Sequence, residues 1–142
     1  MAGPEEFWDL LADRRQGVLA TIGPEGLPHL SNVHYVPDTA RRLVRISTTA
    51  ARVKGRNVLR DRRAVLHVPG PDFFTFAVAE GRVSVGVPRK VGEESIDELY
   101  ALHAAFNGEA PRPAFDERML RERRFVIRLN VTKLYGLIPP RR

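Results

Sequence analysis

Short apolar runs separated by turn residues dominate the hydrophobic pattern of this chain. The clearest is 125–131, where Phe125, Ile127, Leu129 and Val131 alternate with polar residues. This period of two is typical of a half-buried strand. Gly-Pro-Glu-Gly at 23–26 and Pro-Asp-Thr-Ala at 37–40 are turn sequences that favour hairpins. The pattern predicts strands at 18–22, 27–36, 43–48, 64–68, 73–87, 125–131 and 134–137.

Other segments have the apolar spacing of amphipathic helices. Pro4 suits the first position of a helix, and Phe7, Leu10 and Leu11 follow at helical spacing. A longer helix is expected over 95–106, where a stripe of apolar and aromatic residues is more typical of core or dimer contact than of a cofactor site. The sequence predicts helices at 4–15, 95–106 and 114–123, and a basic helix after Thr49.

Six or seven short strands with two or three small helices favour a mainly β protein, an antiparallel barrel. The strands do not alternate regularly with helices, which argues against a doubly wound parallel sheet. A chain of 142 residues fits one domain, here 1–142. Within the long strand expected at 73–87, Gly81 indicates a bulge or a close backbone approach.

Composition narrows the chemistry. The chain has no cysteine, which excludes disulfides, thiolate zinc sites and a cysteine nucleophile. Its histidines show no metal-ligand spacing, so we expect no metal site. His34, His67 and His103 are interpreted as structural or surface residues.

Charge and hydropathy indicate the expected environment. The net charge of +6 favours anionic partners, but the basic residues are spread along the chain and form no basic arm. The aromatic residues are not interleaved with them as stacking platforms would be, which argues against a nucleic-acid binder. There is no apolar run of membrane-spanning length and no signal-peptide pattern, so a cytoplasmic protein is expected.

The stretch 43–61 carries the strongest chemical signal. An apolar strand ends in Ser47-Thr-Thr and is followed by a basic segment with Arg52 and Lys54. Hydroxyls beside the N-terminus of a basic helix are typical of a phosphate site. Arg52 and Lys54 would be about 200° apart within a helix. They can converge on one anion only if the helix begins near Val53.

The order of several motifs resembles the split β-barrel flavin and deazaflavin family, the pyridoxamine 5′-phosphate oxidase-like superfamily. The resemblance is closest to its actinobacterial branch that binds coenzyme F420, a deazaflavin. It runs in order over nearly the whole chain. The motifs are Gly-Val-Leu-Ala-Thr-Ile at 17–22, Pro-His-Leu-Ser-Asn-Val at 28–33, Ile-Ser-Thr at 46–48, Arg-Val-Lys-Gly-Arg-Asn at 52–57, Phe-Ala-Val-Ala-Glu-Gly at 76–81 and Leu-Tyr-Gly at 134–136.

This resemblance implies a six- to seven-stranded split barrel that forms a homodimer, with the cofactor in a groove between subunits. It implies a phosphate site at Ser47, Arg52 and Lys54, supported by Asn57. The ring system would lie between two strands that belong to different subunits. Pro28, His29 and Asn32 on one strand would line the ring, and Phe76, Ala77 and Val78 on the other would come near it or close the pocket. His29 departs from the family pattern, in which an amide is expected.

Strand geometry sharpens some of these assignments. Adjacent residues of a strand face opposite ways, so only one of Ser31 and Asn32 can line a given groove. We favour Asn32, because an amide both donates and accepts at the edge of a heterocycle. Core packing is expected for at least one of Phe74 and Phe76. At Ala77 the small side chain would let a ring approach, with simple barrel packing as the alternative.

Three functions remain open from the sequence. The first is a reductase that transfers hydride from reduced coenzyme F420 to an electrophilic double bond of a small molecule. The second is an FMN-binding protein like pyridoxamine 5′-phosphate oxidase, although Leu-Ile-Pro-Pro-Arg at 137–141 does not match the Arg/Pro signature of the true oxidases. The third is a non-enzymatic carrier of the deazaflavin. No residue matches the role of a catalytic acid or base, and no motif fixes the substrate.

Overall fold

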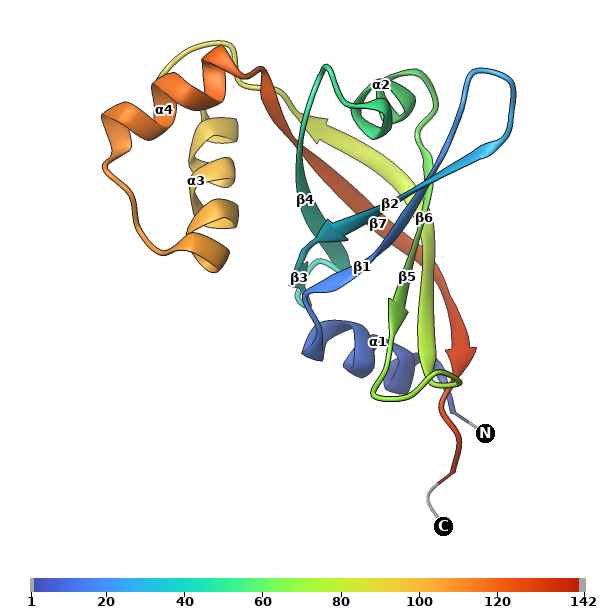
Figure 1. The fold of residues 1–142 in the computed structure, drawn as a ribbon. Coiled ribbons are helices and arrows are strands. Elements are labelled where there is room, and N and C mark those ends of the chain that lie inside the picture. The colour runs from blue at the N-terminus through green and yellow to red at the C-terminus, as the bar shows by residue number, and fades with distance from the viewer. Residues whose placement is uncertain (1, 141–142) are drawn as a thin grey trace.

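The structure, a computed structural model, describes residues 2–140. It is mainly β, with four short helices (Figure 1). The elements, in chain order, are α1 (Pro4–Asp13), β1 (Gln16–Ile22), β2 (Pro28–His34), β3 (Val36–Asp38), β4 (Leu43–Thr49), α2 (Val53–Arg60), β5 (Arg63–Pro69), β6 (Phe76–Gly86), α3 (Glu94–Asn107), α4 (Arg112–Arg121) and β7 (Arg124–Leu137).

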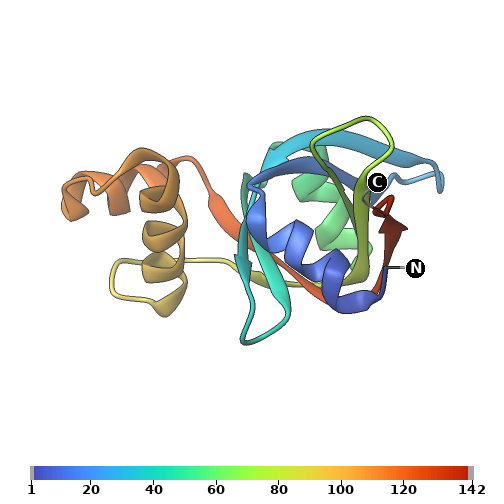
Figure 2. The ribbon, with the colours of Figure 1, turned by 90° about the horizontal axis from the view of Figure 1, so that it is seen from below.

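The strands form one antiparallel seven-stranded sheet in the order β2-β1-β5-β6-β7-β4-β3. The sheet curls into a half-barrel, with α2 at one end and α1 at the other (Figures 1 and 2). Helices α3 and α4 connect β6 to β7 and stand to one side of the barrel, beside β4 and β7 (Figure 1). The expected antiparallel split barrel is therefore confirmed.

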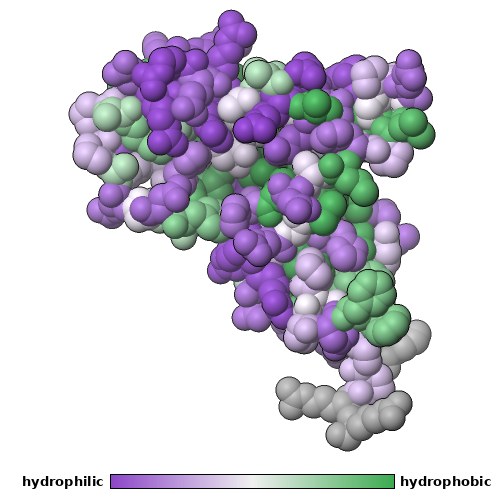
Figure 3. Space-filling view, in the orientation of Figure 1, coloured by the Kyte–Doolittle hydropathy of each residue, from purple (hydrophilic) through white to green (hydrophobic). Residues whose placement is uncertain are grey.

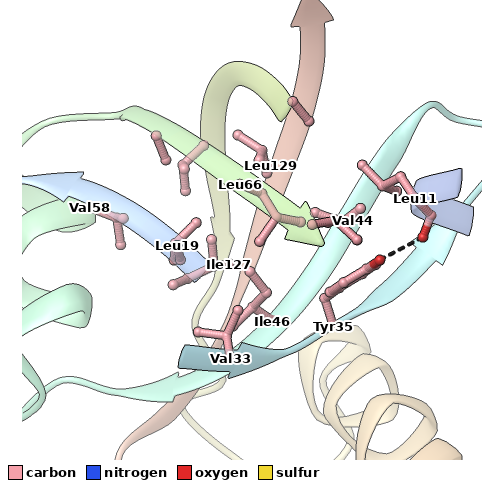
Figure 4. Close-up of a cluster of buried hydrophobic side chains, with 14 of the residues drawn as sticks. Leu11, Leu19, Val33, Tyr35, Val44, Ile46, Val58, Leu66, Ile127 and Leu129 are labelled. Carbon is pink, nitrogen blue, oxygen red and sulfur yellow. Dashed lines mark hydrogen bonds between the residues drawn. The ribbon is translucent and has the colours of Figure 1, made fainter. Parts of the chain in front are cut away.

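The inward faces of the strands build the core. Leu19, Ile46, Leu66 and Ile127 are buried from four different strands (Figure 4). Helix α1 is tied to this core by the hydroxyl of Tyr35, which donates to the Leu11 carbonyl at 2.6 Å. None of the helices within residues 2–140 is long and apolar enough to span a membrane.

Two predicted strand boundaries were wrong. The predicted strand 27–36 is divided, because β2 ends at His34 and β3 begins at Val36. Pro37 was expected in a turn but lies within β3. A proline is tolerated there because β3 is an edge strand, where one side of the backbone needs no hydrogen-bonding partner. The turn instead lies at 39–42, where Arg42 adopts a φ of 52°.

The two strands predicted at the C-terminal end are one continuous strand, β7. The irregularity expected near Thr132 is a register shift opposite Glu80 and Gly81 of β6. A Cβ atom on Gly81 would lie 1.9 Å from the Asn130 carbonyl oxygen, so only glycine fits there. The interpretation of Gly81 as a bulge with close backbone approach is therefore confirmed.

The start of the long β6 strand was also misplaced. The strand begins at Phe76, and Phe73 and Phe74 lie in the preceding loop, where 90% and 66% of their surface is exposed. Phe76 lies on the outer face, stacked on the His67 ring with a centroid distance of 5.3 Å. The prediction that at least one of Phe74 and Phe76 packs in the core was therefore wrong. Asp72 stabilises this loop, because its Oδ1 accepts hydrogen bonds from the backbone N–H groups of Phe74 and Thr75.

Candidate functional site

A hollow lies at the open seam of the half-barrel. Strand β3 pairs with β4 only as far as Arg45, so the segment of β4 from Ile46 to Thr49 has no strand on that side. A pocket of about 420 Å³ lies beside this segment. Its walls come from β2, β4, α2 and α3: Asn32, Val33, His34, Ile46, Ser47, Lys54, Leu102, His103, Phe106 and Asn107.

One corner of the pocket matches the predicted anion site. Helix α2 begins at Val53, and Arg52 precedes it with an extended backbone, φ −73° and ψ 149°. The predicted late helix start is therefore confirmed. No side chain caps this helix, so N–H groups of its first turn remain available to an anion. Ser47 and Lys54 line the pocket beside it.

Gly55 brings α2 close to the end of β4. A Cβ atom at this position would lie 2.2 Å from the Thr49 carbonyl oxygen. Asn57 fixes the same helix from its other side, since its amide donates to the Thr21 hydroxyl at 3.0 Å and accepts from Arg60 at 2.8 Å. The Asn57 side chain is thus buried and satisfied by the protein. It positions the helix that carries Lys54, which is a supporting role.

Positive charge is concentrated at this corner. Burial lowers the pKa of Lys54, and the nearby cations Arg52 and Arg124 lower it further. Arg124 also donates to Ser47 Oγ at 3.4 Å. Glu122 partly balances this charge, since its carboxylate accepts from Arg124 at 2.9 Å. A bound anion would relieve the remaining repulsion between these positive charges. An excess of positive charge is what a phosphate site requires.

His103 of α3 forms the wall next to Ser47. Its Nε2 lies 2.9 Å from Ser47 Oγ, and its ring packs edge-on against Phe115 with a centroid distance of 5.4 Å. Burial lowers the pKa of His103, with a further contribution from Arg124 and Arg118. Both effects favour the neutral imidazole in the unliganded protein.

Strand β2 presents only some of its predicted ligands to the pocket. Asn32 lines it, while Ser31 faces inward, as the alternation predicted. Pro28 is on the same exposed face as Asn32 but lies outside the pocket lining. His29 is on the opposite face, and its Nδ1 is buried without a hydrogen-bonding partner. The structure thus brings together Asn32, Ser47 and Lys54 and separates His29 from them.

The predicted ring contacts on β6 are not in this pocket. Phe76 and Val78 lie on the outer face of the sheet, where Phe76 is partly exposed and Val78 is only 5% exposed. Ala77 faces the barrel interior and is fully buried. Two strands, β1 and β5, separate β6 from β2. With a strand spacing of about 4.8 Å, Val78 is roughly 14 Å from Asn32 in the same sheet. Within one copy of the chain, these two groups of predicted residues do not meet.

The sequence reasoning missed several pocket residues. Arg124 was not singled out, and His103 was interpreted as structural or surface, although both contact Ser47. His34 was treated likewise, yet it lines the pocket with its ring 4.9 Å from that of Phe106. The helical stripe of 95–106 contained His103 and Phe106, but local spacing could not show which strand the helix approaches.

The side chains available suit an organic anion more than a metal ion. Residues 2–140 contain no group of three histidine, aspartate or glutamate side chains arranged to bind a metal. Hydroxyl, ammonium and guanidinium donors surround the corner, and the adjoining wall offers the Asn32 amide and the Phe106 ring. This combination fits a phosphate linked to a planar or extended group.

Comparison with solved structures gives the same fold. An F420 reductase is 24% identical, with a TM-score of 0.70, and the match covers 94% of this chain and 98% of that one. A conserved hypothetical protein from Mycobacterium tuberculosis is 24% identical with a TM-score of 0.69, covering 94% and 83%. The heme storage protein HutZ from Vibrio cholerae is 14% identical with a TM-score of 0.69, covering 96% and 95%.

Sequence comparison assigns the family. The profile described as Pyridoxamine 5′-phosphate oxidase matches residues 4–137, which span the barrel, the seam pocket and the α3–α4 hairpin. Proteins of this fold include oxidoreductases that bind flavins and proteins that bind heme. The chain therefore belongs to the pyridoxamine 5′-phosphate oxidase family of split β-barrels.

Proposed function

We propose that this protein is a coenzyme F420-dependent reductase, which delivers hydride from the reduced deazaflavin to an electrophilic double bond of a small molecule. The observation that carries the proposal is the corner where Ser47, Lys54 and Arg124 meet the uncapped start of α2. These donors suit a phosphate group, and the similarity to an F420 reductase supports a deazaflavin.

A second copy of the chain would complete the site. A cross-strand row joins the pocket to the outer face of the sheet, since Asn32 pairs with Val18, Val18 with His67, His67 with Val78 and Val78 with Tyr135. Apolar side chains gather on this face and at the β5–β6 turn (Figure 3). Those exposed include Leu30, Phe73, Phe74, Tyr135 and Leu137.

We therefore propose a homodimer formed through this outer face. In a two-fold dimer the same patch is used by both subunits, so residues far apart in one sheet can meet across the interface. Phe76 and Val78 of one subunit would then close the pocket of the other. This arrangement accounts for the gap of two strands between the predicted ring contacts.

The roles of the chain's own residues follow from their positions. Lys54, Arg124 and Ser47 would hold the phosphate, and Arg52 would add charge at the entrance. The Asn32 amide, on the exposed side of β2, would orient the ring edge by donating or accepting a hydrogen bond. The cofactor supplies the hydride, while the protein fixes the reacting atoms and excludes water.

Titration of the purified protein with coenzyme F420 and with FMN tests this proposal. We expect F420 to bind at least about tenfold more tightly than FMN, corresponding to about 1.4 kcal/mol. Equal or reversed affinity would favour the FMN-binding alternative. Heme belongs in the same titration, because structural relatives include heme-binding proteins.

Turnover separates an enzyme from a carrier. The reduced cofactor should be reoxidised in the presence of the protein by at least one member of a panel of enones, quinones and tetrapyrroles. Tight F420 binding without reoxidation by any of them would favour the carrier function.

The dimer has its own test. Phe76→Glu would place a charge in the proposed interface and should convert the dimer to a monomer in sedimentation experiments. Val91→Glu is the matched control, because Val91 is exposed in the loop before α3, away from the outer face of the sheet. A wild-type protein that sediments as a monomer with cofactor bound would contradict the dimer.

A further inference from the structure

The hydroxyl of Ser47 lies between two nitrogen groups. Arg124 Nη1 is 3.4 Å from Ser47 Oγ, and His103 Nε2 is 2.9 Å from the same oxygen. A guanidinium can only donate, so Ser47 accepts from Arg124. The direction of the Ser47–His103 hydrogen bond depends on whether His103 Nε2 carries a proton.

The two directions have opposite consequences for an anion. A hydroxyl has one proton to donate and two lone pairs to accept with. If His103 is the neutral tautomer with its proton on Nδ1, Ser47 donates its only proton to Nε2 and has none for a ligand. If His103 is the imidazolium, with both nitrogens protonated, Ser47 accepts from both neighbours, and its own proton is free to point into the pocket.

We propose that His103 is a positioning residue for the bound anion, and that cofactor binding takes up a proton at His103 Nε2. The proton turns the Ser47 hydroxyl into a donor toward the phosphate and adds a positive charge to the pocket wall. His103 thus couples the α3–α4 hairpin to the anion corner, although it is separated from Ser47 by 56 positions in the chain.

The charges around His103 explain why the proton arrives with the ligand. Arg124 of β7 and Arg118 of α4 face the ring, Lys54 of α2 lines the same pocket, and Glu122 follows α4. Burial and the two arginines lower the pKa of His103, and Glu122 offsets only part of this. A bound anion opposes the arginines and raises the pKa. Between the two pKa values, binding takes up a proton, so affinity falls as pH rises.

Calorimetry measures this uptake directly. The inference rests on the proposed function, so the ligand is coenzyme F420, titrated at pH 7 in non-phosphate buffers of different ionisation enthalpy. The slope of the observed enthalpy against buffer enthalpy gives the protons taken up. We expect a clear fraction of one proton for the wild type and close to none for His103→Gln. The Kd should rise about threefold to tenfold from pH 6 to 8 in the wild type, and less than about twofold in the variant.

A matched control separates His103 from its neighbour. His34→Gln also removes an imidazole from the pocket lining but leaves the Ser47 contact intact, so proton uptake should persist. Imidazole nitrogen NMR of the wild-type protein needs no variant and should show both ring nitrogens of His103 protonated as ligand is added. No uptake in the wild type, or uptake that persists in His103→Gln, would overturn the inference.

The outcomes for the two proposals are distinguishable. Tight F420 binding without proton uptake would leave the proposed function standing and refute the role of His103. If F420 does not bind, the proposed function fails, and the same calorimetric series with inorganic sulfate tests His103 alone. Failure of sulfate to produce uptake would then overturn the inference as well.

Discussion

Helix α3 takes part in two charged clusters that differ in their balance. Near its start, Glu98 accepts from Arg45 at 2.7 Å and from both Nε and Nη2 of Arg128 at 2.7 and 2.6 Å. Arg45 also donates to Asp38 at 2.9 Å. Asp38 accepts from Arg41 as well, at 3.1 Å. Each guanidinium group of this cluster thus donates to a carboxylate, and the cluster is complete without a ligand.

The cluster around Ser47, five residues further along α3 at His103, is different. Three cations lie close together there, Arg52, Lys54 and Arg124. Within residues 2–140, only Arg124 of these three forms an ion pair, with Glu122. Charge balance therefore distinguishes a cluster that holds the fold together from one that is suited to bind a ligand. The balanced cluster holds the α3–α4 hairpin against β4 and β7, whereas the unbalanced one is suited to a partner with negative charge.

Removing the lysine of the unbalanced cluster should have the largest effect. Lys54→Ala should weaken F420 binding by about 1.5–3 kcal/mol, because it removes a charge-assisted hydrogen bond to the phosphate. Its stability should remain close to that of the wild type, since Lys54 has like charges around it. Fluorescence titration gives the affinity and urea unfolding the stability.

Lys90→Ala is the control for this change. Lys90 is exposed in the loop before α3, so the variant loses the same net charge away from the pocket. We expect its affinity to match that of the wild type. Equal weakening in the two variants would mean that general electrostatics, rather than the corner, governs binding.

Disrupting the balanced cluster should instead lower stability. Glu98→Gln leaves the partly buried Arg128 without its carboxylate and leaves Arg45 with Asp38 alone. It should reduce the free energy of unfolding by about 2 kcal/mol, less than for a fully buried pair. Urea unfolding measures it, with the exposed Glu94→Gln as control. If Glu98→Gln weakened cofactor binding more than it lowered stability, the distinction between the clusters would be wrong.

Acid should reduce the stability that the balanced cluster contributes, because it protonates Glu98 and Asp38. Burial alone would raise the pKa of Glu98, but hydrogen bonds from Arg128 and Arg45 outweigh it and the pKa is lowered. The hydrogen bond from Arg45 likewise lowers the pKa of Asp38. The stability that they contribute is present above the unfolded values of about 4 and is lost as pH falls through the folded values. Unfolding at pH 5 and pH 3 should show a smaller loss in Glu98→Gln than in the wild type.

The smallest expected effect is that of a simple anion. At concentrations of about 10–50 mM, sulfate should raise the thermal midpoint of the wild type by about 1–3 °C, because it binds the folded corner only. Lys54→Ala should show less of this shift than Lys90→Ala. Identical shifts in the two variants would indicate a general salt effect on the surface.

The sequence predicted the local parts of this arrangement. The start of α2 near Val53 followed from the angle between Arg52 and Lys54, and the bulge at Gly81 from a glycine inside a strand. These features depend on residues that are close in the chain. Strand alternation predicted that only one of Ser31 and Asn32 could line a given groove, and the chemistry of the amide favoured Asn32.

The long-range parts could not be predicted in the same way. Arg124 reaches Ser47 because β7 pairs with β4 in a register that places it opposite Thr49. His103 reaches Ser47 because the hairpin inserted between β6 and β7 folds back along β4. A short-range pattern contains neither the register nor the direction of the hairpin. The ring contacts predicted on β2 and β6 lie apart within one copy of the chain, and in the proposed dimer they would meet across two copies.

A crystal structure of the protein with coenzyme F420 tests the central claim most directly. The account predicts that the phosphate lies within hydrogen-bonding distance of Ser47 Oγ and Lys54 Nζ, at the first turn of α2, with the ring beside Asn32. A phosphate bound elsewhere, with Ser47 still bonded only to His103 and Arg124, would contradict the account.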